Sequence, residues 1–291
     1  MKLSVLAVES LCRFARPGWR AKTLYGIFRG LFALIPIRRK LVLESLRLSF
    51  PEKDLRWRRD TLKRIYRHYA WMIVEVLAAQ NDPSLVLRMV SEVEGQENLD
   101  WLCAQKIGCF ILTGHMSNWE LCGAWVALSG YPLETAVRDT DDPDFAELIE
   151  KYRQNMKITT LRKGALGVRT MVKHALQGKW VALLSDQDAG RDAVPVWFLG
   201  RHTTMVEGPA ALSLTAQVPL IPIYSIRLAP FSYKMCILPP LATGQEGRSR
   251  GNIVKLTLKA NETLEEMVRR APEQWFWFHR RWKTNPDTAQ A

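Results

Sequence analysis

The chain predicts an α/β fold, in which a largely parallel or mixed central sheet is flanked by helices and preceded by a helical N-terminal region. Two observations predict this class. From about Val93 onward, short apolar runs alternate with stretches of helical periodicity, which is typical of parallel sheets with helices on both faces. In the first 80 or so residues, apolar positions recur at helical spacing instead. The 291 residues are enough for one large domain or two small ones.

The N-terminal region contains an apolar stretch over residues 23–40 that carries Arg29 in its middle. A transmembrane helix needs about 20 mostly apolar residues, and a central arginine disfavours insertion by roughly 2.5–3.5 kcal/mol. We therefore expect an interfacial, membrane-associating helix, and the alternative is a helix buried within the domain. Its apolar positions are Leu24, Ile27, Phe28, Leu31, Phe32 and Ile35, and the flanking cations are Arg20, Lys22, Arg38, Arg39 and Lys40. This divides the chain into membrane-associating helices over residues 1–50 and an α/β domain over residues 51–291.

The remaining elements follow from local patterns. Asp54 is a good N-cap for a long amphipathic helix that runs to about residue 79. Apolar runs predict strands at 109–113, 134–138, 180–185, 219–226 and 233–238. Helical periodicity predicts helices at 117–128, 142–156, 165–177, 209–217 and 252–270.

Charge and cysteine content limit the partners. The formal net charge is +12 and the pI is near 9.7, which favours an anionic partner such as nucleic acid, anionic lipid or an acidic protein. The sequence lacks helix-turn-helix, zinc-finger and RNP signatures, so we expect no nucleic acid. Five cysteines without a CxxC pair indicate a reduced, cytosol-facing protein. The scattered histidines predict no metal site.

A candidate site follows the strand at 109–113, in the stretch GHMSNWE over residues 114–120. In open α/β sheets, ligands bind beyond the carboxyl ends of strands. Glu120, in the first turn of the next helix, can hold one imidazole nitrogen of His115 while the other acts as a general base. The alternative is a capping box formed by Ser117 and Glu120, which needs no histidine.

Missing motifs narrow the chemistry. The sequence has no G-x-S-x-G elbow, no Walker loop and no G-x-G-x-x-G. A base without a protein nucleophile suits direct attack of an alcohol on an activated carbonyl, such as a thioester.

Several blocks resemble the bacterial lipid A late acyltransferases (lauroyl or myristoyl transferases), within the H-x4-D/E glycerolipid-type acyltransferases. GHMSNWE is similar to their H-x-x-N-W-E block. RKGALGVRTMVKHALQGKWVALLSDQDAG, VPVWFLGRHTTMVEGPAALSLTAQVPLIPIY and PEQWFWFHRRWK resemble later blocks in the family's order, so the resemblance covers most of the chain.

The resemblance implies roles for individual residues. It makes His115 the general base and Glu120 its charge partner. The implied substrate-binding residues are Asn118, Trp119, Arg138, Arg153, Asp186, Gln187, Glu207 and Gly208. Six of them also have a structural alternative. Trp119 could be core, Arg138 could pair with Asp139, Asp141 or Asp142, and Arg153 could pair with Glu150. Asp186 and Gln187 could have an N-cap or turn role, and Glu207 could be a surface charge.

The implied function is membrane-associated O-acyl transfer from acyl carrier protein or coenzyme A to a hydroxyl of a lipid A precursor or related glycolipid. It requires no metal and no cofactor beyond the acyl thioester. The implied location is the cytoplasmic face of the inner membrane, and the positive charge suits phosphorylated lipid, an anionic membrane surface and acidic carrier protein. The alternatives are another lipid acceptor (phospholipid, ornithine lipid or phosphatidylinositol mannoside) and a non-catalytic membrane-binding homologue.

Overall fold

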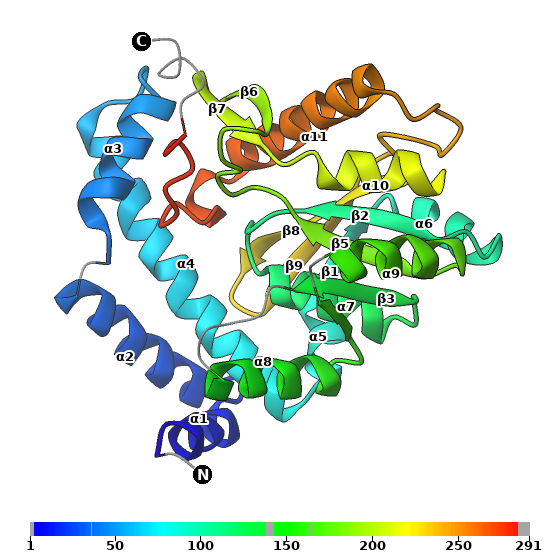
Figure 1. Cartoon of the computed structure of the whole chain (residues 1–291). Helices are drawn as coiled ribbons and strands as arrows, with labels where there is room; N and C mark the ends of the chain where they lie inside the picture. Colours follow the sequence, from blue (N-terminus) through cyan, green and yellow to red (C-terminus); the bar gives the residue numbers. More distant parts are fainter. Residues whose placement is uncertain (1–2, 36, 138–142, 163–164, 285–291) are drawn as a thin grey trace.

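A seven-stranded sheet lies at the centre of the computed structural model, which describes residues 3–35, 37–137, 143–162 and 165–284 (Figure 1). The strand order is β1-β9-β8-β2-β5-β3-β4, and every pairing is parallel except that between β8 and β9. The predicted class, a largely parallel sheet flanked by helices, is confirmed. The strands are β1 (Val90–Glu94), β2 (Cys109–Thr113), β3 (Leu133–Val137), β4 (Thr159–Arg162), β5 (Trp180–Leu184), β8 (Leu220–Ala229) and β9 (Ser232–Ile237).

Helices cover both faces of the sheet because the central strands are apolar on both sides. Along β2, Phe110 and Leu112 belong to one buried cluster and Cys109 and Ile111 to another, as the twofold alternation of a strand requires. The first cluster includes residues of α9 (Ala165–Leu176), α10 (Gly208–Ala216) and α11 (Arg250–Arg270). The second includes residues of α5 (Ser84–Met89), α6 (Gln96–Ala104) and α7 (Trp119–Leu128).

The N-terminal helices form a layer beside the sheet, organised by one long helix. This helix, α4 (Leu55–Asn81), is capped as predicted: the Asp54 side chain accepts a hydrogen bond from the Trp57 N–H at 2.7 Å. Helices α1 (Leu3–Phe14), α2 (Trp19–Leu34) and α3 (Arg39–Ser49) all pack on α4. Val42 and Leu46 of α3 share a buried cluster with Trp277 from the far end of the chain.

The single interfacial helix predicted over residues 23–40 is wrong in its extent. Helix α2 ends at Leu34, and α3 begins at Arg39 after Arg38 adopts a left-handed conformation with φ 49°. Leu24 is buried against α4, whereas Ile27, Leu31 and Leu34 are exposed. Helix α2 therefore buries one side within the protein and presents an apolar side to the outside. Among the described helices, none is both long enough and apolar enough to cross a bilayer.

Most predicted elements match the structure to within about three residues, and the elements not predicted are short. They include β1, whose side chains are mostly exposed, along with β4, α5 and α6. The antiparallel hairpin of β6 (Val194–Phe198) and β7 (Arg201–Met205) was not predicted either. Helix α8 (Pro143–Asn155) and the short helix η1 (Pro272–Gln274) complete the described elements.

Candidate active site

The site is built where two neighbouring parallel strands end. Thr113, the last residue of β2, pairs with Leu184, the last residue of β5. The loops that follow therefore leave the same sheet edge side by side and bring His115 next to Asp186. The His115 Nδ1 lies 2.7 Å from Asp186 Oδ1, and the His115 backbone N–H donates to Asp186 Oδ2, also at 2.7 Å. Asp186 was predicted to orient substrate or to stabilise the site, and in the structure its carboxylate holds the imidazole.

The charge state of Asp186 determines which ring nitrogen of His115 carries the hydrogen. Burial alone would raise the pKa of Asp186, but the charge of His115 and hydrogen bonds from His115 and Trp275 outweigh burial and lower it. A carboxylate that stays ionised only accepts hydrogen bonds, so Nδ1 carries the hydrogen. Nε2 is then the nitrogen that can take a proton. The His115 side chain is 22% exposed, against 2% for Asp186, so the imidazole ring is accessible from outside and the carboxylate is not.

Gly114 lets the two loops come this close. A Cβ atom at this position would lie 3.1 Å from both the Cβ and Cγ atoms of Asp186 and 3.1 Å from Leu264 Cδ1. Contacts this short require the neighbours to shift. The φ angle of Gly114 is not positive, so backbone conformation does not require glycine here. The reason for glycine is the close packing against Asp186 and Leu264. Gly114 was not predicted as a site residue, since nothing local in the stretch reveals which side chain faces it.

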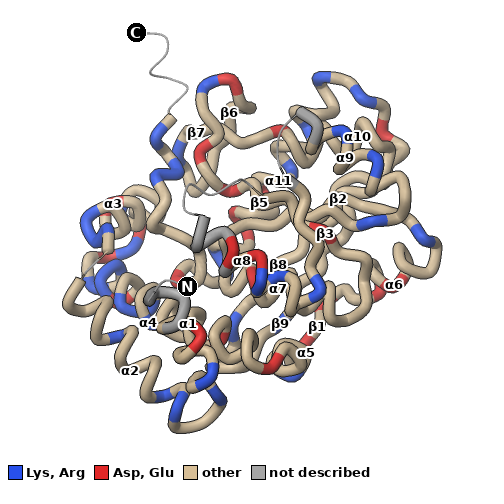
Figure 2. The backbone as a smooth tube through the Cα atoms, turned by 60° about the horizontal axis from the view of Figure 1, so that its bottom comes forward, with Lys and Arg blue, Asp and Glu red and all other residues tan. Residues whose placement is uncertain are grey.

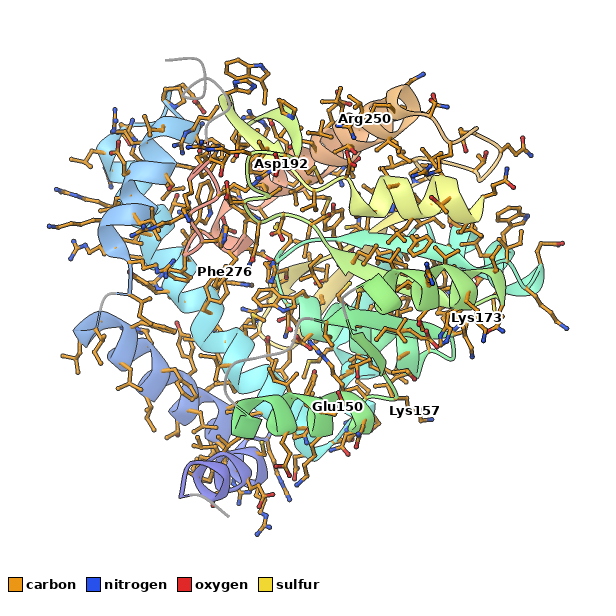
Figure 3. The ribbon with its side chains drawn as sticks, viewed as in Figure 1. Glu150, Lys157, Lys173, Asp192, Arg250 and Phe276 are labelled. Atoms are coloured by element: carbon orange, nitrogen blue, oxygen red, sulfur yellow. The ribbon has the colours of Figure 1, made fainter. Side chains whose placement is uncertain are left out.

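Residues 274–276 of the C-terminal segment pack against both loops of the site. The Trp275 indole N–H donates to Asp186 Oδ2 at 2.9 Å, and the Phe276 N–H donates to the His115 carbonyl at 3.0 Å. The Ser117 N–H donates to the carbonyl of Gln274 at 2.7 Å. Phe276 lies in the middle of the molecule (Figure 3), with its ring centroid 5.8 Å from that of His115. The PEQWFWF stretch thus pairs with the backbone of the His115 loop and donates a hydrogen bond to the carboxylate of Asp186.

Glu120 does not occupy the position predicted for it. Its carboxylate lies 3.4 Å from Arg153 Nη2, which joins α7 to α8, while Asp186 is bonded to His115 Nδ1. The predicted pairing of Glu120 with the imidazole at that nitrogen is therefore replaced by Asp186. The pairing of Arg153 with Glu150 is also wrong, because Glu150 bonds Thr160 and Gln154. Both side chains of the Glu120–Arg153 pair are partly exposed, so the pair can still face a substrate.

Two other residues of the motif have different surroundings. Trp119 is half-buried, and its ring packs edge-on against His115 at 4.9 Å between centroids. Asn118 is fully buried. Its side chain caps α7 by accepting from the Leu121 N–H at 3.0 Å and reaches the Tyr233 hydroxyl at 3.5 Å. Asn118 was predicted to shape the substrate pocket, and both ends of its amide contact protein groups in this structure.

The alternative interpretation, a capping box formed by Ser117 and Glu120, is not what the structure shows. Helix α7 is capped by Asn118, and Ser117 is a buried residue in the left-handed region with φ 54°. Its carbonyl lies 3.2 Å from His68 Nε2, and Arg227 Nη1 lies 3.2 Å from His68 Nδ1. An arginine only donates, so Nε2 of His68 carries the hydrogen and donates to Ser117. Burial and then the charge of Arg227 lower the pKa of His68 well below its usual value, which keeps it neutral.

Of the remaining predicted residues, two contact arginine side chains and one lies outside the described residues. Gln187 follows Asp186, and its carbonyl accepts from Arg281 at 3.3 Å. Glu207 forms a salt bridge with Arg250, which lies well away from Phe276 (Figure 3). No atom lies within 4 Å of a Cβ placed on Gly208, so the fold itself does not require glycine there. Arg138 lies outside the described residues. Nor do the described residues contain a group of three or more His, Cys, Asp or Glu suited to a metal ion.

Comparison with known proteins gives a consistent result. The profile of the bacterial lipid A biosynthesis acyltransferase family matches residues 6–284. The chain is 26% identical to the lipid A biosynthesis palmitoleoyltransferase of Escherichia coli over 86% of this chain and 80% of that protein. It is 27% identical to the lipid A biosynthesis lauroyltransferase of the same organism, over the same shares. It is 24% identical to a phosphatidylinositol mannoside acyltransferase of Mycobacterium tuberculosis, over 52% of this chain and 49% of that protein.

The family match spans the N-terminal helices, the His115 loop and the C-terminal segment that closes the site. The chain belongs to the bacterial lipid A biosynthesis acyltransferase family and is an acyltransferase.

Proposed function

We propose that this acyltransferase moves a fatty acyl chain from an acyl thioester to a hydroxyl of a lipid A precursor, with His115 as the general base. The observation that carries the mechanism is the short contact of 2.7 Å between His115 Nδ1 and the buried carboxylate of Asp186. This contact leaves Nε2 as the basic nitrogen, on a ring that is partly exposed. The donor is acyl carrier protein or coenzyme A, each of which presents the acyl chain as a thioester.

The chemical step needs no covalent enzyme intermediate. Nε2 removes the proton from the acceptor hydroxyl as its oxygen attacks the thioester carbonyl. The tetrahedral intermediate then collapses and expels the thiolate, and the imidazolium returns its proton to the sulfur. Asp186 stabilises the imidazolium while it exists, and Trp275 keeps the carboxylate in place. No resident metal or cofactor takes part in this scheme.

Substrate binding is assigned to groups around this centre. Glu120 and Arg153 form a partly exposed ion pair beside the His115 loop, and we propose that Arg153 contacts the headgroup or the thioester. Trp119 packs against the imidazole and shapes the entrance. Arg138, Gln187, Glu207 and Gly208 remain proposed substrate contacts, supported by the resemblance of their sequence blocks alone.

The names and coverage of the relatives support a lipid A precursor over other acceptors. The two Escherichia coli relatives, which align with this chain over 80% of their own length, are named lipid A biosynthesis enzymes. The phosphatidylinositol mannoside acyltransferase aligns over only 49% of its length. The second candidate is therefore the same chemistry on a mannosylated inositol lipid. Supplying each acceptor to the purified protein and measuring acylation distinguishes the two.

We also propose that the protein works on the cytoplasmic face of the inner membrane. The first 80 residues contain 17 Lys and Arg against six Asp and Glu, while the rest of the chain contains 24 against 23. Nearly all of the surplus positive charge therefore belongs to the layer of α1 to α4, where blue segments are frequent in Figure 2. The exposed apolar side of α2 belongs to the same layer. Apolar side chains next to cations suit peripheral binding to an anionic leaflet and approach of an acidic carrier protein.

The test of the mechanism compares three variants in a purified transfer assay. We expect His115→Ala to abolish transfer and Asp186→Asn to lower kcat by about 10³- to 10⁴-fold, since the amide no longer fixes the tautomer or the charge. Glu120→Gln should cost less, because Glu120 is bonded to Arg153. If Asp186→Asn retains full kcat while its thermal unfolding is unchanged, the role of Asp186 is wrong.

A further inference from the structure

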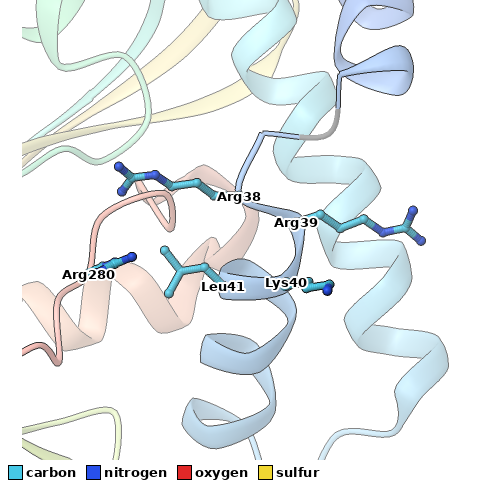
Figure 4. A pocket seen from close by; sticks show the side chains of 5 residues that line it. All are labelled: Arg38, Arg39, Lys40, Leu41 and Arg280. Carbon is cyan, nitrogen blue, oxygen red and sulfur yellow. The ribbon is translucent and has the colours of Figure 1, made fainter.

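A second site opens at the start of α3, apart from the His115 centre. It is a cavity of about 500 Å³ lined by Arg38, Arg39, Lys40, Leu41 and Arg280 (Figure 4). Four of its five lining residues are cations, and all four are exposed. In the described part of the chain, no carboxylate forms a salt bridge with any of them. Such a concentration of uncompensated charge favours an anion.

The backbone contributes to the same cavity. The lining residues 38–41 are the N-cap and first three positions of α3, and no side chain caps this helix. The N–H groups of a first turn have no partner within the helix, and the helix dipole places positive potential there. An anion with several oxygens can accept from these N–H groups and from the guanidinium groups together.

Two contacts hold the walls of the cavity in place. The Tyr66 hydroxyl donates to the Ile37 carbonyl at 3.0 Å, which fixes the entry into α3. Arg38 Nη1 donates to the Phe278 carbonyl at 2.5 Å, which ties this turn to the C-terminal segment two residues before Arg280. Arg38 and Arg280 lie on the same side of the start of α3, near Leu41, whereas Arg39 and Lys40 extend to the other side (Figure 4). Of the four cations, Arg38 and Arg280 are therefore the two that share a side of the cavity.

The same C-terminal segment connects the cavity to the active site. Phe278 packs on Phe276 with ring centroids 5.5 Å apart, and Phe276 packs on His115. A lipid with a phosphorylated headgroup in the cavity would therefore lie within a few side chains of the general base. We propose that the first turn of α3 and Arg280 bind a phosphomonoester on the headgroup of the lipid acceptor. This assignment rests on the proposed transfer to a lipid acceptor, and it adds the headgroup contact that positions that acceptor.

The test uses Arg280→Gln and Arg280→Glu in the full chain, with Lys283→Gln and Lys283→Glu as matched controls. Both residues are exposed and lie in the same segment, but Lys283 does not line the cavity. The binding arm measures sedimentation with phosphatidylcholine vesicles that contain either phosphatidic acid, a phosphomonoester, or phosphatidylglycerol, a phosphodiester. We expect both Arg280 variants to weaken binding to the phosphatidic acid vesicles by about tenfold, and the Lys283 variants to bind like the unmodified protein. Inorganic phosphate should release the protein from these vesicles more than chloride of the same ionic strength.

Equal losses for Arg280 and Lys283 variants, or equal losses on both vesicle types, would mean that only general charge matters and would overturn the site. The kinetic arm compares a phosphorylated acceptor with its dephosphorylated form. Arg280→Gln should raise KM about tenfold on the first with little change in kcat, and should have no effect on the second. If the protein acylates no lipid but its Arg280-dependent binding to phosphatidic acid persists, the transfer proposal fails and the phosphate site stands.

Discussion

At the scale of single residues, the site depends on a carboxylate that stays ionised in a buried place. Asp186 is 3% exposed and still has a lowered pKa, because His115 and Trp275 compensate for the loss of water. Two different residue types thus stabilise one charge, each by donating hydrogen bonds to the carboxylate. The imidazole partner is therefore Asp186, two residues beyond the end of β5, and not Glu120 in the first turn of α7.

The lowered pKa of Asp186 predicts how stability depends on pH. A group whose folded pKa is depressed contributes stability above its unfolded value of 3.8, and this contribution is lost as pH falls through the folded value. We therefore expect the unmodified protein to exceed Asp186→Asn in unfolding free energy at neutral pH, and the difference to shrink on acidification. Urea unfolding of both proteins between about pH 6 and about pH 3 measures it. A difference that grows on acidification would contradict the lowered pKa.

Gly114 makes a second prediction at this scale. In Gly114→Ala the new methyl group meets Asp186 and Leu264 at 3.1 Å, so the carboxylate must move away from the imidazole. We expect kcat to fall by about tenfold to a hundredfold, since small displacements of a catalytic group are costly. Gly247→Ala is the control, because no atom lies within 4 Å of a Cβ at that position. Activity of Gly114→Ala equal to that of the control would show that the loop tolerates the shift.

At the scale of elements, a buried ion pair fastens α4 to β8 beneath the His115 loop. Arg227 Nη2 lies 2.5 Å from Glu75, and these side chains are 8% and 0% exposed. The same arginine bonds His68, which donates to Ser117. Gln274 accepts from the Arg227 N–H at 2.8 Å and donates to the Arg227 carbonyl at 3.0 Å. The conformation of the loop is thus held by residues from three distant parts of the chain.

Breaking this pair should be costly. In Arg227→Met the carboxylate of Glu75 is left buried without its cation, and we expect the free energy of unfolding to fall by about 3–5 kcal/mol. Arg270→Met breaks an exposed pair with Glu266 on α11 and should cost at most about 1 kcal/mol. Chemical denaturation of both variants gives the comparison. Equal losses would mean that burial of the Arg227 pair has no energetic weight.

At the scale of the whole molecule, charge and exposed apolar surface coincide in the N-terminal layer. The exposed side chains of Ile27, Leu31, Leu34 and Ile35 belong to α2 and the residue that ends it. Helix α2 buries its other side against α4, so it is a component of the fold and also a candidate membrane contact. Helix α3 shares a buried cluster with the C-terminal segment, so residues 1–50 pack as part of the same fold. The predicted boundary between membrane-associating helices over residues 1–50 and an α/β domain over residues 51–291 therefore remains a proposal about function.

This arrangement predicts membrane binding that depends on α2. We expect Leu31→Ser with Leu34→Ser to lower partitioning onto anionic vesicles by at least about tenfold, because two apolar side chains no longer enter the bilayer. The control is Leu176→Ser with Leu258→Ser, which changes exposed leucines on α9 and α11. Sedimentation of both variants with vesicles measures the effect. Equal partitioning of the two variants would exclude α2 as the contact.

The sequence by itself determined the alternation of strands and helices after residue 93, the cap at Asp54, and the place of His115 just beyond β2. These features depend on local periodicity and on residues close together in the chain. Only the tertiary structure decided that Asp186 rather than Glu120 holds Nδ1, that Trp275 supports it, and that Arg280 joins the first turn of α3 at one cavity. These contacts join segments from 71 to about 240 residues apart, and they follow from the parallel register of β2 with β5 and from the return of the C-terminal chain, which no local pattern encodes.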